Sequence, residues 1–211
     1  MYTPSAFAEH DLAGLDWLLA RDPFATLVTP GGDGLPVATH LPVLYARHGG
    51  QVLLEGHWAR PNPQAGHAGP ALLVVHGPHH YISPGWYPDK AQAARVPTWN
   101  YAAAHLSGTL EPLHEEADLA SIVARLGERF EPPVGGYWRY DPDDERERRQ
   151  LRGIVGFRFH PSRIELKFKL NQNHPPANVE GAIAGLRRQP GDAAAEVAAL
   201  MADRLARRRP E

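Results

Sequence analysis

The stretch PVATHLPVLYARHGGQVLLEGHWARPNPQ, residues 36–64, carries alternating apolar residues on both sides of a Gly-Gly pair. A period of two is typical of half-buried strands, and consecutive glycines readily adopt the positive φ angles that a tight hairpin turn requires. We therefore predict a hairpin with strands at residues 36–45 and 51–58.

A two-residue turn would set the two faces of this hairpin. With His48-Gly49 or Gly49-Gly50 at its centre, His40, His57 and Glu55 project from one face. That face is predicted to be surface, an interface or a ligand site, whereas a three-residue turn would put the two histidines on opposite faces. The other face then belongs to the core and carries Val37, Leu41, Val43, Val52, Leu54 and Trp58.

The hairpin runs into a polar corner in which Asn62-Pro63 is the preferred pair for an N-cap and a first helical residue. A short helix is therefore predicted to begin there. Free N–H groups at such a helix start favour an anion, and Arg60, two residues upstream, can bind phosphate with two parallel hydrogen bonds. A phosphate-binding corner is one interpretation; an Arg paired with a surface carboxylate beside an ordinary cap is the other.

Apolar patterns predict further strands at residues 24–28, 71–77, 96–113 and 153–170, and helices at residues 9–21, 115–130, 141–150, 176–188 and 192–207. The helix at 141–150 would carry i,i+4 pairs between Asp144 and Arg148 and between Glu145 and Arg149. In the last strand the buried parity changes at His160-Pro161-Ser162, which predicts a bulge or turn between two segments. Strands linked mostly by hairpins, with helices at the edges, predict an antiparallel β-barrel or α+β domain rather than a Rossmann fold.

The composition limits the function classes. Of the 211 residues, 43% are apolar and 22% charged, which is ordinary for a globular domain. The formal charge of −2 gives no global attraction to nucleic acid, so any DNA contact has to be local. The absence of cysteine excludes disulfides and thiolate metal sites; because no export signal or membrane-spanning segment is visible either, we expect a cytoplasmic protein.

Three further groups of residues could form a site. Twelve histidines, including HGPHH at 76–80, could hold a metal or haem, but they lack regular ligand spacing, which favours scattered structural histidines. The aromatic residues of YISPGWYPDK (81–90) and VPTWNY (96–101) form either a stacking wall for a planar ligand or the cover of a core edge. Gln172 and Asn173, which follow Lys169 on the polar side of the last strand, could bond a ring edge or cap the strand end.

Six motifs, in order along nearly the whole chain, resemble the PaiB-type FMN-binding negative transcriptional regulators. They are MYTPSAF, ATHLPVL, GHWARPNPQ, YISPGWYPDK, VPTWNYAAAHLSG and KLNQN. The resemblance implies an antiparallel split β-barrel with peripheral helices and a helical C-terminus, usually a homodimer with FMN sites at the subunit interface. It also implies repression of sporulation and degradative-enzyme genes. We expect the split-barrel domain at residues 1–173 and a helical extension, packed on the same domain, at 174–211.

The resemblance further implies an FMN site built from Thr39, His40, Leu41, His57, Ala59, Arg60, Asn62, Trp99, Lys169, Gln172 and Asn173. In it, Arg60 and Asn62 would take the phosphate, and the last-strand residues could come from the other subunit. The chain departs from the family at two positions. The family more often has Ser where Asn171 stands and a small residue where Pro61 stands, and Pro61 stiffens the approach to Asn62.

Two other functions stay open at this point, and no catalytic residue is assigned. A flavin-dependent oxidoreductase would use FMN with NAD(P)H, and His40 or His57 could supply a proton. A haem-binding protein of the same fold would use a histidine as axial ligand. Direct DNA binding by a regulator would depend on a small set of arginines, namely Arg187, Arg188, Arg204, Arg207, Arg208 and Arg209.

Overall fold

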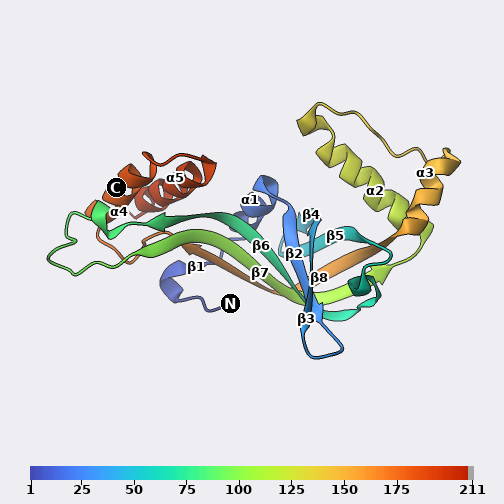
Figure 1. The fold of residues 1–211 in the computed structure, drawn as a ribbon, viewed down its shortest axis with the longest axis horizontal. Coiled ribbons are helices and arrows are strands. Elements are labelled where there is room, and N and C mark those ends of the chain that lie inside the picture. Colours follow the sequence, from blue (N-terminus) through green and yellow to red (C-terminus); the bar gives the residue numbers. More distant parts are fainter. Residues whose placement is uncertain (209–211) are drawn as a thin grey trace. The chain divides into compact units, whose positions relative to one another are not determined.

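The computed structural model describes residues 1–208, which form one sheet and a set of helices (Figure 1). The strands are β1 (Ala8–Glu9), β2 (Phe24–Pro30), β3 (Pro36–Pro42), β4 (Leu44–His48), β5 (Gln51–Ala59), β6 (Gly69–Ile82), β7 (Thr98–Leu113) and β8 (Ile154–Lys169). The α-helices are α1 (Ala13–Arg21), α2 (Glu116–Phe130), α3 (Glu145–Gln150), α4 (Pro176–Leu186) and α5 (Asp192–Ala206). Short 3₁₀ helices are η1 (Ser5–Phe7), η2 (Pro63–Gly66), η3 (Pro84–Trp86), η4 (Pro132–Val134) and η5 (Leu151–Gly153).

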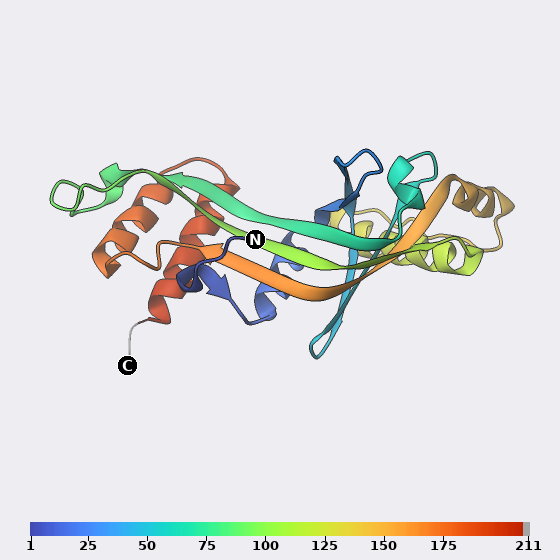
Figure 2. The same ribbon diagram turned by 90° about the horizontal axis from the view of Figure 1, so that it is seen from below.

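The strands follow the order β3-β2-β6-β7-β8-β5-β4, and β1 pairs separately with β8. Figure 2 shows the three long strands β6, β7 and β8 next to one another. β2 is antiparallel to β3 and β6, and β5 is antiparallel to β4 and β8. Since β3 and β4 are edges, the sheet of the described residues does not close. The predicted antiparallel architecture with peripheral helices is confirmed.

The chain forms two compact units. Unit 1 consists of Met1–Leu18, His76–Ala104 and the described part of Glu165–Glu211, and unit 2 consists of Leu19–Val75 and His105–Ile164. β6, β7 and β8 contribute residues to both units. The expected boundary at residue 173 does not coincide with this division and stays a prediction.

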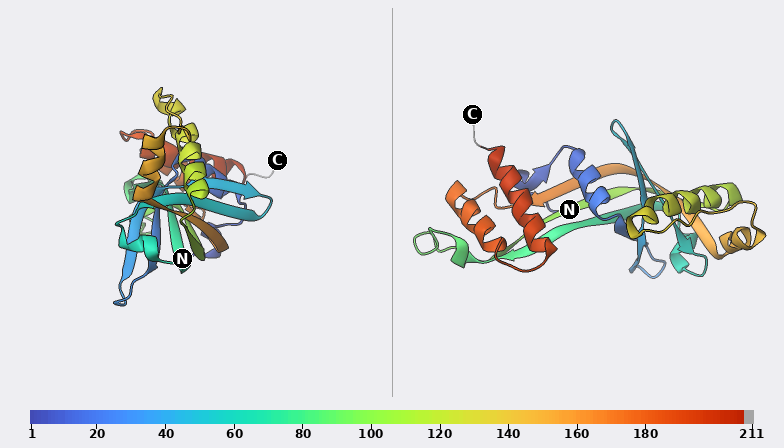
Figure 3. Two further views of the ribbon diagram at one scale, coloured as in Figure 1. Left: turned by 90° about the vertical axis from the view of Figure 1, so that its right-hand side faces the viewer. Right: turned by 90° about the horizontal axis from the view of Figure 1, so that it is seen from above.

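Unit 2 buries most of the face that the alternation in residues 36–58 assigns to the core. Leu54 and Trp58 are fully enclosed, and the Trp58 ring centroid lies 4.7 Å from that of Phe157. α2 packs on β4 and β5 through an apolar stripe that includes Leu119 and Ile122 (Figure 3). Each such buried side chain contributes about 1.5–3 kcal/mol, so this packing holds α2 over one side of β5.

Unit 1 places α4 beside α5 (Figure 3). Val179 of α4 and Val197 and Met201 of α5 are buried between the helices and their surroundings, as expected for helices predicted from apolar patterns. The aromatic-rich loop at residues 81–90 approaches α4 closely, because a Cβ at Gly185 would lie 2.2 Å from the Trp86 ring. Any larger residue at Gly185 would therefore displace this loop.

The structure corrects the predicted hairpin. The Gly49-Gly50 turn is confirmed, since His48 pairs with Gln51. However, β4 alone pairs with β5, whereas β3 pairs with β2. The change of partner occurs after Pro42, which has no N–H to continue a ladder.

This change separates the two histidines that the hairpin prediction joined. His40 pairs with Thr26 in β2, at one edge of the sheet. His57 pairs with Gly156 in β8, inside the strand order. The prediction that both project from one face of a single hairpin is therefore wrong, because parity arguments hold only while two strands stay paired.

β8 is also simpler than predicted, because it is one strand and no turn divides it. The buried parity nevertheless changes as expected, from Phe159 before Pro161 to Leu166 and Phe168 after it. The change lies close to the residue at which β8 passes from unit 2 to unit 1. Each part of the strand thus directs its apolar residues into the core of its own unit.

α3 covers Glu145–Gln150, the second part of the helix predicted at 141–150, and has one of the two expected ion pairs. Glu145 and Arg149 lie 3.1 Å apart, as predicted. The predicted pair of Asp144 with Arg148 is wrong, because Asp144 is the N-cap and accepts from the Arg146 N–H at 2.8 Å. A capping carboxylate turns back to the first helical turn and cannot also reach along the helix face.

Candidate functional site

The corner after β5 has the predicted start of a helix. The Asn62 side chain accepts from the Gln64 N–H at 2.9 Å, and Pro63 is the first helical residue. The helix η2 is only four residues long, and the Ala65 N–H donates to the Asn62 carbonyl at 2.9 Å. Since Pro63 has no N–H, the first three residues of η2 have no free donor. An anion at this corner would therefore depend on side chains, contrary to the helix-start argument.

Arg60 is exposed, and the protein uses only part of its guanidinium. Nε donates to the Arg152 carbonyl at 2.5 Å and Nη2 to the Ile154 carbonyl at 3.0 Å. The Arg60 backbone N–H also donates to the Gly153 carbonyl at 2.8 Å. Because a guanidinium has five N–H donors, three remain for a ligand. No carboxylate within residues 1–208 pairs with Arg60, so the surface ion-pair alternative has no partner there.

Thr39 and Asn62 add further donors to this corner. Asn62 Nδ2 donates to Thr39 Oγ1 at 3.0 Å, which ties the corner to β3. A hydroxyl that accepts one bond still has its own proton to donate, and the second Nδ2 proton of Asn62 is also unused. Both side chains are half-buried. Together with Arg60 they form a donor set without a competing carboxylate, which suits a phosphate dianion.

A residue that the sequence reasoning missed, Gln64, holds the corner in place. Its side chain is fully buried, and its amide oxygen accepts from Trp58 Nε1 at 3.1 Å. Its amide nitrogen lies within hydrogen-bond distance of three acceptors, at 3.0–3.1 Å, on Leu27, Thr29 and Val37. Gln64 therefore links η2 to β2, β3 and β5. The signal in the sequence is weak, since a Gln after Asn-Pro also occurs in any exposed turn.

The other expected residues of β3 and β5 have different surroundings. His40 is exposed; its Nδ1 lies 2.9 Å from Thr26 Oγ1, and its ring stacks on Phe24 with centroids 6.5 Å apart. The Leu41 side chain is buried in the core, so only its backbone could border a ligand. Ala59 is exposed at the end of β5.

Glu55 and His57 lie on the side of β5 that α2 covers. Glu55 is buried and binds Arg125 of α2 at 2.7 Å and Arg158 of β8 at 2.9 Å. Its side chain is therefore not part of a surface or ligand face, which corrects the prediction. His57, two residues further along, points to the same side; its Nδ1 is buried without a hydrogen-bond partner. Burial lowers the pKa of His57, which favours the neutral ring.

In unit 1, Lys169 near the end of β8 is held by β7. Its Nζ donates to Thr98 Oγ1 and, at 2.9 Å, to the Trp99 carbonyl. Burial lowers the pKa of Lys169, since desolvation disfavours the ammonium form. An ammonium has three donors, so one remains for a ligand.

The residues after Lys169 close the strand end. The Gln172 side chain accepts from the Leu170 N–H at 2.7 Å and donates to the Phe168 carbonyl, which favours the capping interpretation. Asn173 is exposed. Asn171 has a φ of 62° and donates to the Tyr87 hydroxyl at 2.9 Å. Asn tolerates the left-handed region better than most residues, which explains Asn at this position.

The aromatic residues of unit 1 divide into two groups, so each interpretation applies to part of them. Tyr87 is buried and covers a core edge. Trp99 and Tyr81 are 53% and 41% exposed, with ring centroids 6.1 Å apart, and His79 lies 6.0 Å from Trp99. The exposed group leaves free ring surface on which a planar ligand could stack.

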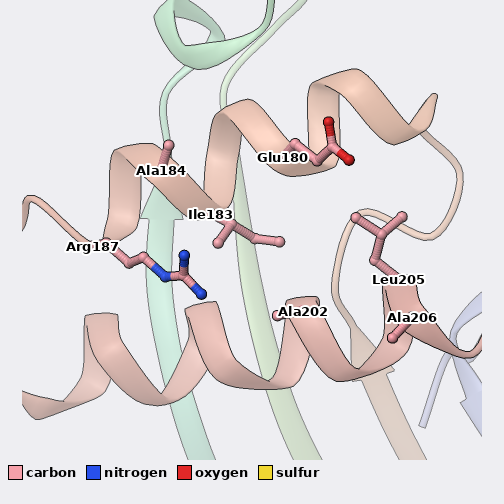
Figure 4. A pocket seen from close by; sticks show the side chains of 7 residues that line it. All are labelled: Glu180, Ile183, Ala184, Arg187, Ala202, Leu205 and Ala206. Atoms are coloured by element: carbon pink, nitrogen blue, oxygen red, sulfur yellow. The ribbon is translucent and has the colours of Figure 1, made fainter.

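A pocket of about 280 Å³ in unit 1 lies between α4 and α5 (Figure 4). It is lined by Glu180, Ile183, Ala184, Arg187, Ala202, Leu205 and Ala206. None of the expected FMN residues lines it. Within residues 1–208, no group of three or more His, Asp or Glu side chains is arranged to hold a metal ion, and no helix has the length and apolarity to cross a membrane.

Comparison with known proteins identifies the family. Residues 1–163 match the family described as "Putative FMN-binding domain". The chain is 31% identical, over 209 residues, to "Protease synthase and sporulation protein PAI 2" of Bacillus subtilis, a match that covers 97% of this chain and 98% of that protein. The chain belongs to the PaiB-type FMN-binding family. Its cofactor is FMN.

Solved structures with low sequence identity show the same fold. An FAD- and haem-binding protein from Mycobacterium smegmatis superposes with a TM-score of 0.54 at 19% identity, covering 77% of this chain and 73% of that chain. A flavocytochrome from Azotobacter vinelandii gives a TM-score of 0.54 at 16% identity, covering 77% and 69%. The PaiB-type chain is therefore a split β-barrel, as predicted.

The donor set at the corner fits the phosphate end of FMN. The unused N–H groups of Arg60, the Thr39 hydroxyl proton and the Asn62 amide are all donors, and a phosphate presents only acceptors at neutral pH. When bound, FMN supplies the capacity for hydride and electron transfer. The chain itself supplies charge and orientation.

Proposed function

We propose that this protein is a homodimeric, FMN-loaded regulator of the PaiB type, in which Arg60, Thr39 and Asn62 hold the FMN phosphate. The partial use of Arg60 carries the proposal: two of its five N–H donors orient it on backbone carbonyls and three are free. The Bacillus subtilis relative, named for protease synthesis and sporulation, supports the regulatory part. The absence of cysteine supports a cytoplasmic location.

We further propose that His40, the Leu41 backbone and Ala59 contact the rest of the flavin bound at the corner. Trp99, Lys169 and Asn173 would contact it from the other subunit of the dimer. Trp99 offers exposed ring surface, and Lys169 retains one donor. His57 and Gln172 would act indirectly, because the first lies under α2 and the second bonds its own backbone.

Regulation of the proposed kind would act without a broad DNA-binding face. Of the arginines expected to contact DNA, Arg204 is held by Glu9 at 2.5 Å, and Arg207 forms an exposed pair with Asp203 at 2.9 Å. Arg208 donates to the Gln172 carbonyl, and Arg209 lies outside the described residues. A promoter-fragment gel shift with a steep salt dependence would show direct DNA binding and would replace the indirect route.

The phosphate corner is tested with two flavins that differ only in the phosphate. Titrating the apoprotein with FMN and with riboflavin, while following flavin fluorescence, should show clearly tighter binding of FMN. Equal affinities would exclude the corner. The visible spectrum of the purified protein adds a second check, because a haem Soret band or bleaching by NAD(P)H would favour the haem or oxidoreductase alternative.

A further inference from the structure

A second group of guanidinium side chains surrounds a pocket in unit 2 that no expected FMN residue lines. The pocket has a volume of about 370 Å³, and its lining residues are Glu116, Glu145, Arg148, Arg149 and Arg152. Small-molecule sites start at about 300 Å³, so the space is sufficient for a small ligand. Every lining residue is charged. The pocket therefore suits an ionic group, and no apolar or aromatic residue lines it for a ring or an acyl chain.

The charges in this pocket are not balanced. Arg148 pairs with Glu116 at 2.8 Å and Arg149 with Glu145 at 3.1 Å, and all four side chains are at least half exposed. Exposed pairs of this kind contribute about 0–1 kcal/mol, so an incoming anion can share their guanidinium groups. The Arg152 side chain has no carboxylate partner within residues 1–208. One positive charge in the pocket is thus left over.

The backbone presents Arg148 and Arg152 on the same side. α3 continues into η5 through Leu151 with φ −58° and ψ −27°, so the backbone stays helical between the two arginines. Residues four apart on a helix are neighbours, and like charges at this spacing repel by about 0.2–0.5 kcal/mol. An anion between them would remove that repulsion. Arg60 fixes the same segment through its bonds to the carbonyls of residues 152–154.

We infer that this pocket is a binding site for a small phosphate-bearing anion, separate from the FMN site. Arg152 provides the main contact, and Arg148 is shared between the anion and Glu116. A nucleic-acid strand fits less well, because the segment that leads into α3 adds the exposed carboxylates of Asp141 and Asp143, which would repel a continuous phosphate backbone.

The experiment is a calorimetric titration of the FMN-saturated full chain with inorganic pyrophosphate at constant ionic strength. Arg152→Ala should weaken binding about tenfold, the loss of one charge-assisted contact. Glu116→Gln should strengthen binding severalfold, because it frees Arg148. Arg146→Ala is the matched control, because Arg146 lies on the same helix and its side chain is 85% exposed, but it does not line the pocket. The pyrophosphate affinity of this variant should stay within about twofold of that of the original protein.

An opposite response of two variants cannot arise from partial unfolding, and thermal unfolding of each variant checks that it folds. Absence of binding, or equal losses in the Arg152 and Arg146 variants, would overturn the proposal. Competition between pyrophosphate and FMN would also overturn it, since the pocket would then hold the flavin phosphate. If the chain takes up no FMN, the same titration on the unloaded chain still tests this pocket, so the two proposals can fail independently.

Discussion

Two regions of this protein contain the residues expected to bind FMN, and they use their polar groups in opposite ways. At the corner after β5, two N–H groups of Arg60 donate to backbone carbonyls and three have no protein acceptor. At the end of β8, the Gln172 amide oxygen accepts from the Leu170 N–H and its amide nitrogen donates to the Phe168 carbonyl. Lys169 donates to two oxygens of β7. The side chains at the corner are held in place but still have unused hydrogen-bond donors, whereas those at the strand end have bonded most of theirs.

The difference separates ligand binding from strand capping better than residue type does. Gln and Asn side chains can do either, and their presence after a strand does not distinguish the two roles. Unused donors on a side chain that is held in place do distinguish ligand binding from strand capping, because a bound ligand can replace water at donors that have no protein acceptor. We therefore expect the corner to control affinity for the phosphate and the strand end to control mainly stability.

The largest expected effect comes from the residue that holds the corner. Gln64→Leu removes the side-chain partner of the buried Trp58 indole N–H and the amide bonds to the Leu27 and Val37 carbonyls, while Thr29 Oγ1 keeps His67 as a partner. The free energy of unfolding should fall by about 3 kcal/mol. The variant should also lose part of its preference for FMN over riboflavin. Urea unfolding and the two flavin titrations measure these changes. Unchanged selectivity would mean that Gln64 only stabilises the fold.

Arg60→Ala tests the corner directly. The loss of charge-assisted bonds should weaken FMN binding by about 2 kcal/mol, while riboflavin binding changes little. Arg60→Lys is the control, because it keeps the charge but loses the planar fork, and it should recover only part of the affinity. Fluorescence titration measures both. If FMN affinity stays at the original level in Arg60→Ala, the phosphate does not bind at this corner.

Gln172→Leu is the matched substitution at the strand end and should have a smaller effect. It removes one bond to the Leu170 N–H and one to the Phe168 carbonyl, both at a partly exposed position. The free energy of unfolding should fall by about 1 kcal/mol, and FMN affinity should change less than about twofold. A large loss of FMN affinity with unchanged stability would place Gln172 at the flavin and reverse the comparison.

Much of the fold could be predicted from local patterns, because strand alternation, helical stripes and the Gly49-Gly50 turn depend on neighbouring residues. The exchange of strand partners after Pro42 could not be predicted, since a run of alternating residues does not say where it changes neighbour. Glu55 shows the consequence. The sequence predicts that a charged residue on a strand is exposed. Glu55 is buried only because α2, over sixty residues later in the chain, covers it and places Arg125 beside its carboxylate.

The candidate site was predictable to a similar extent. The Asn62-Pro63 cap follows from two adjacent residues and is confirmed. The N–H groups at the start of η2 are bonded within the corner because η2 is only four residues long. The sequence pattern predicted where this helix begins but not where it ends. Gln64 escaped notice because its four partners lie on β2, β3 and β5, and long-range hydrogen bonds leave no periodic signal.

The smallest expected effect compares one histidine from each region. His57, three residues before Arg60, and His174, two residues after Gln172, each have a buried Nδ1 without a partner, and burial lowers both pKa values. The unfolded chain, with a histidine pKa of about 6.5, then binds protons that the folded chain does not. Stability should therefore fall as the pH drops below about 7 and level off below the folded pKa values.

The pH effect can be assigned to each region by removing one titrating ring at a time. His57→Gln and His174→Gln should each flatten the fall in unfolding free energy between about pH 7 and pH 5. Flattening by only one buried variant would show that water reaches the other ring. If His57→Gln flattens the curve without changing FMN affinity, the region under α2 acts on stability alone. The phosphate corner three residues away then works independently of it.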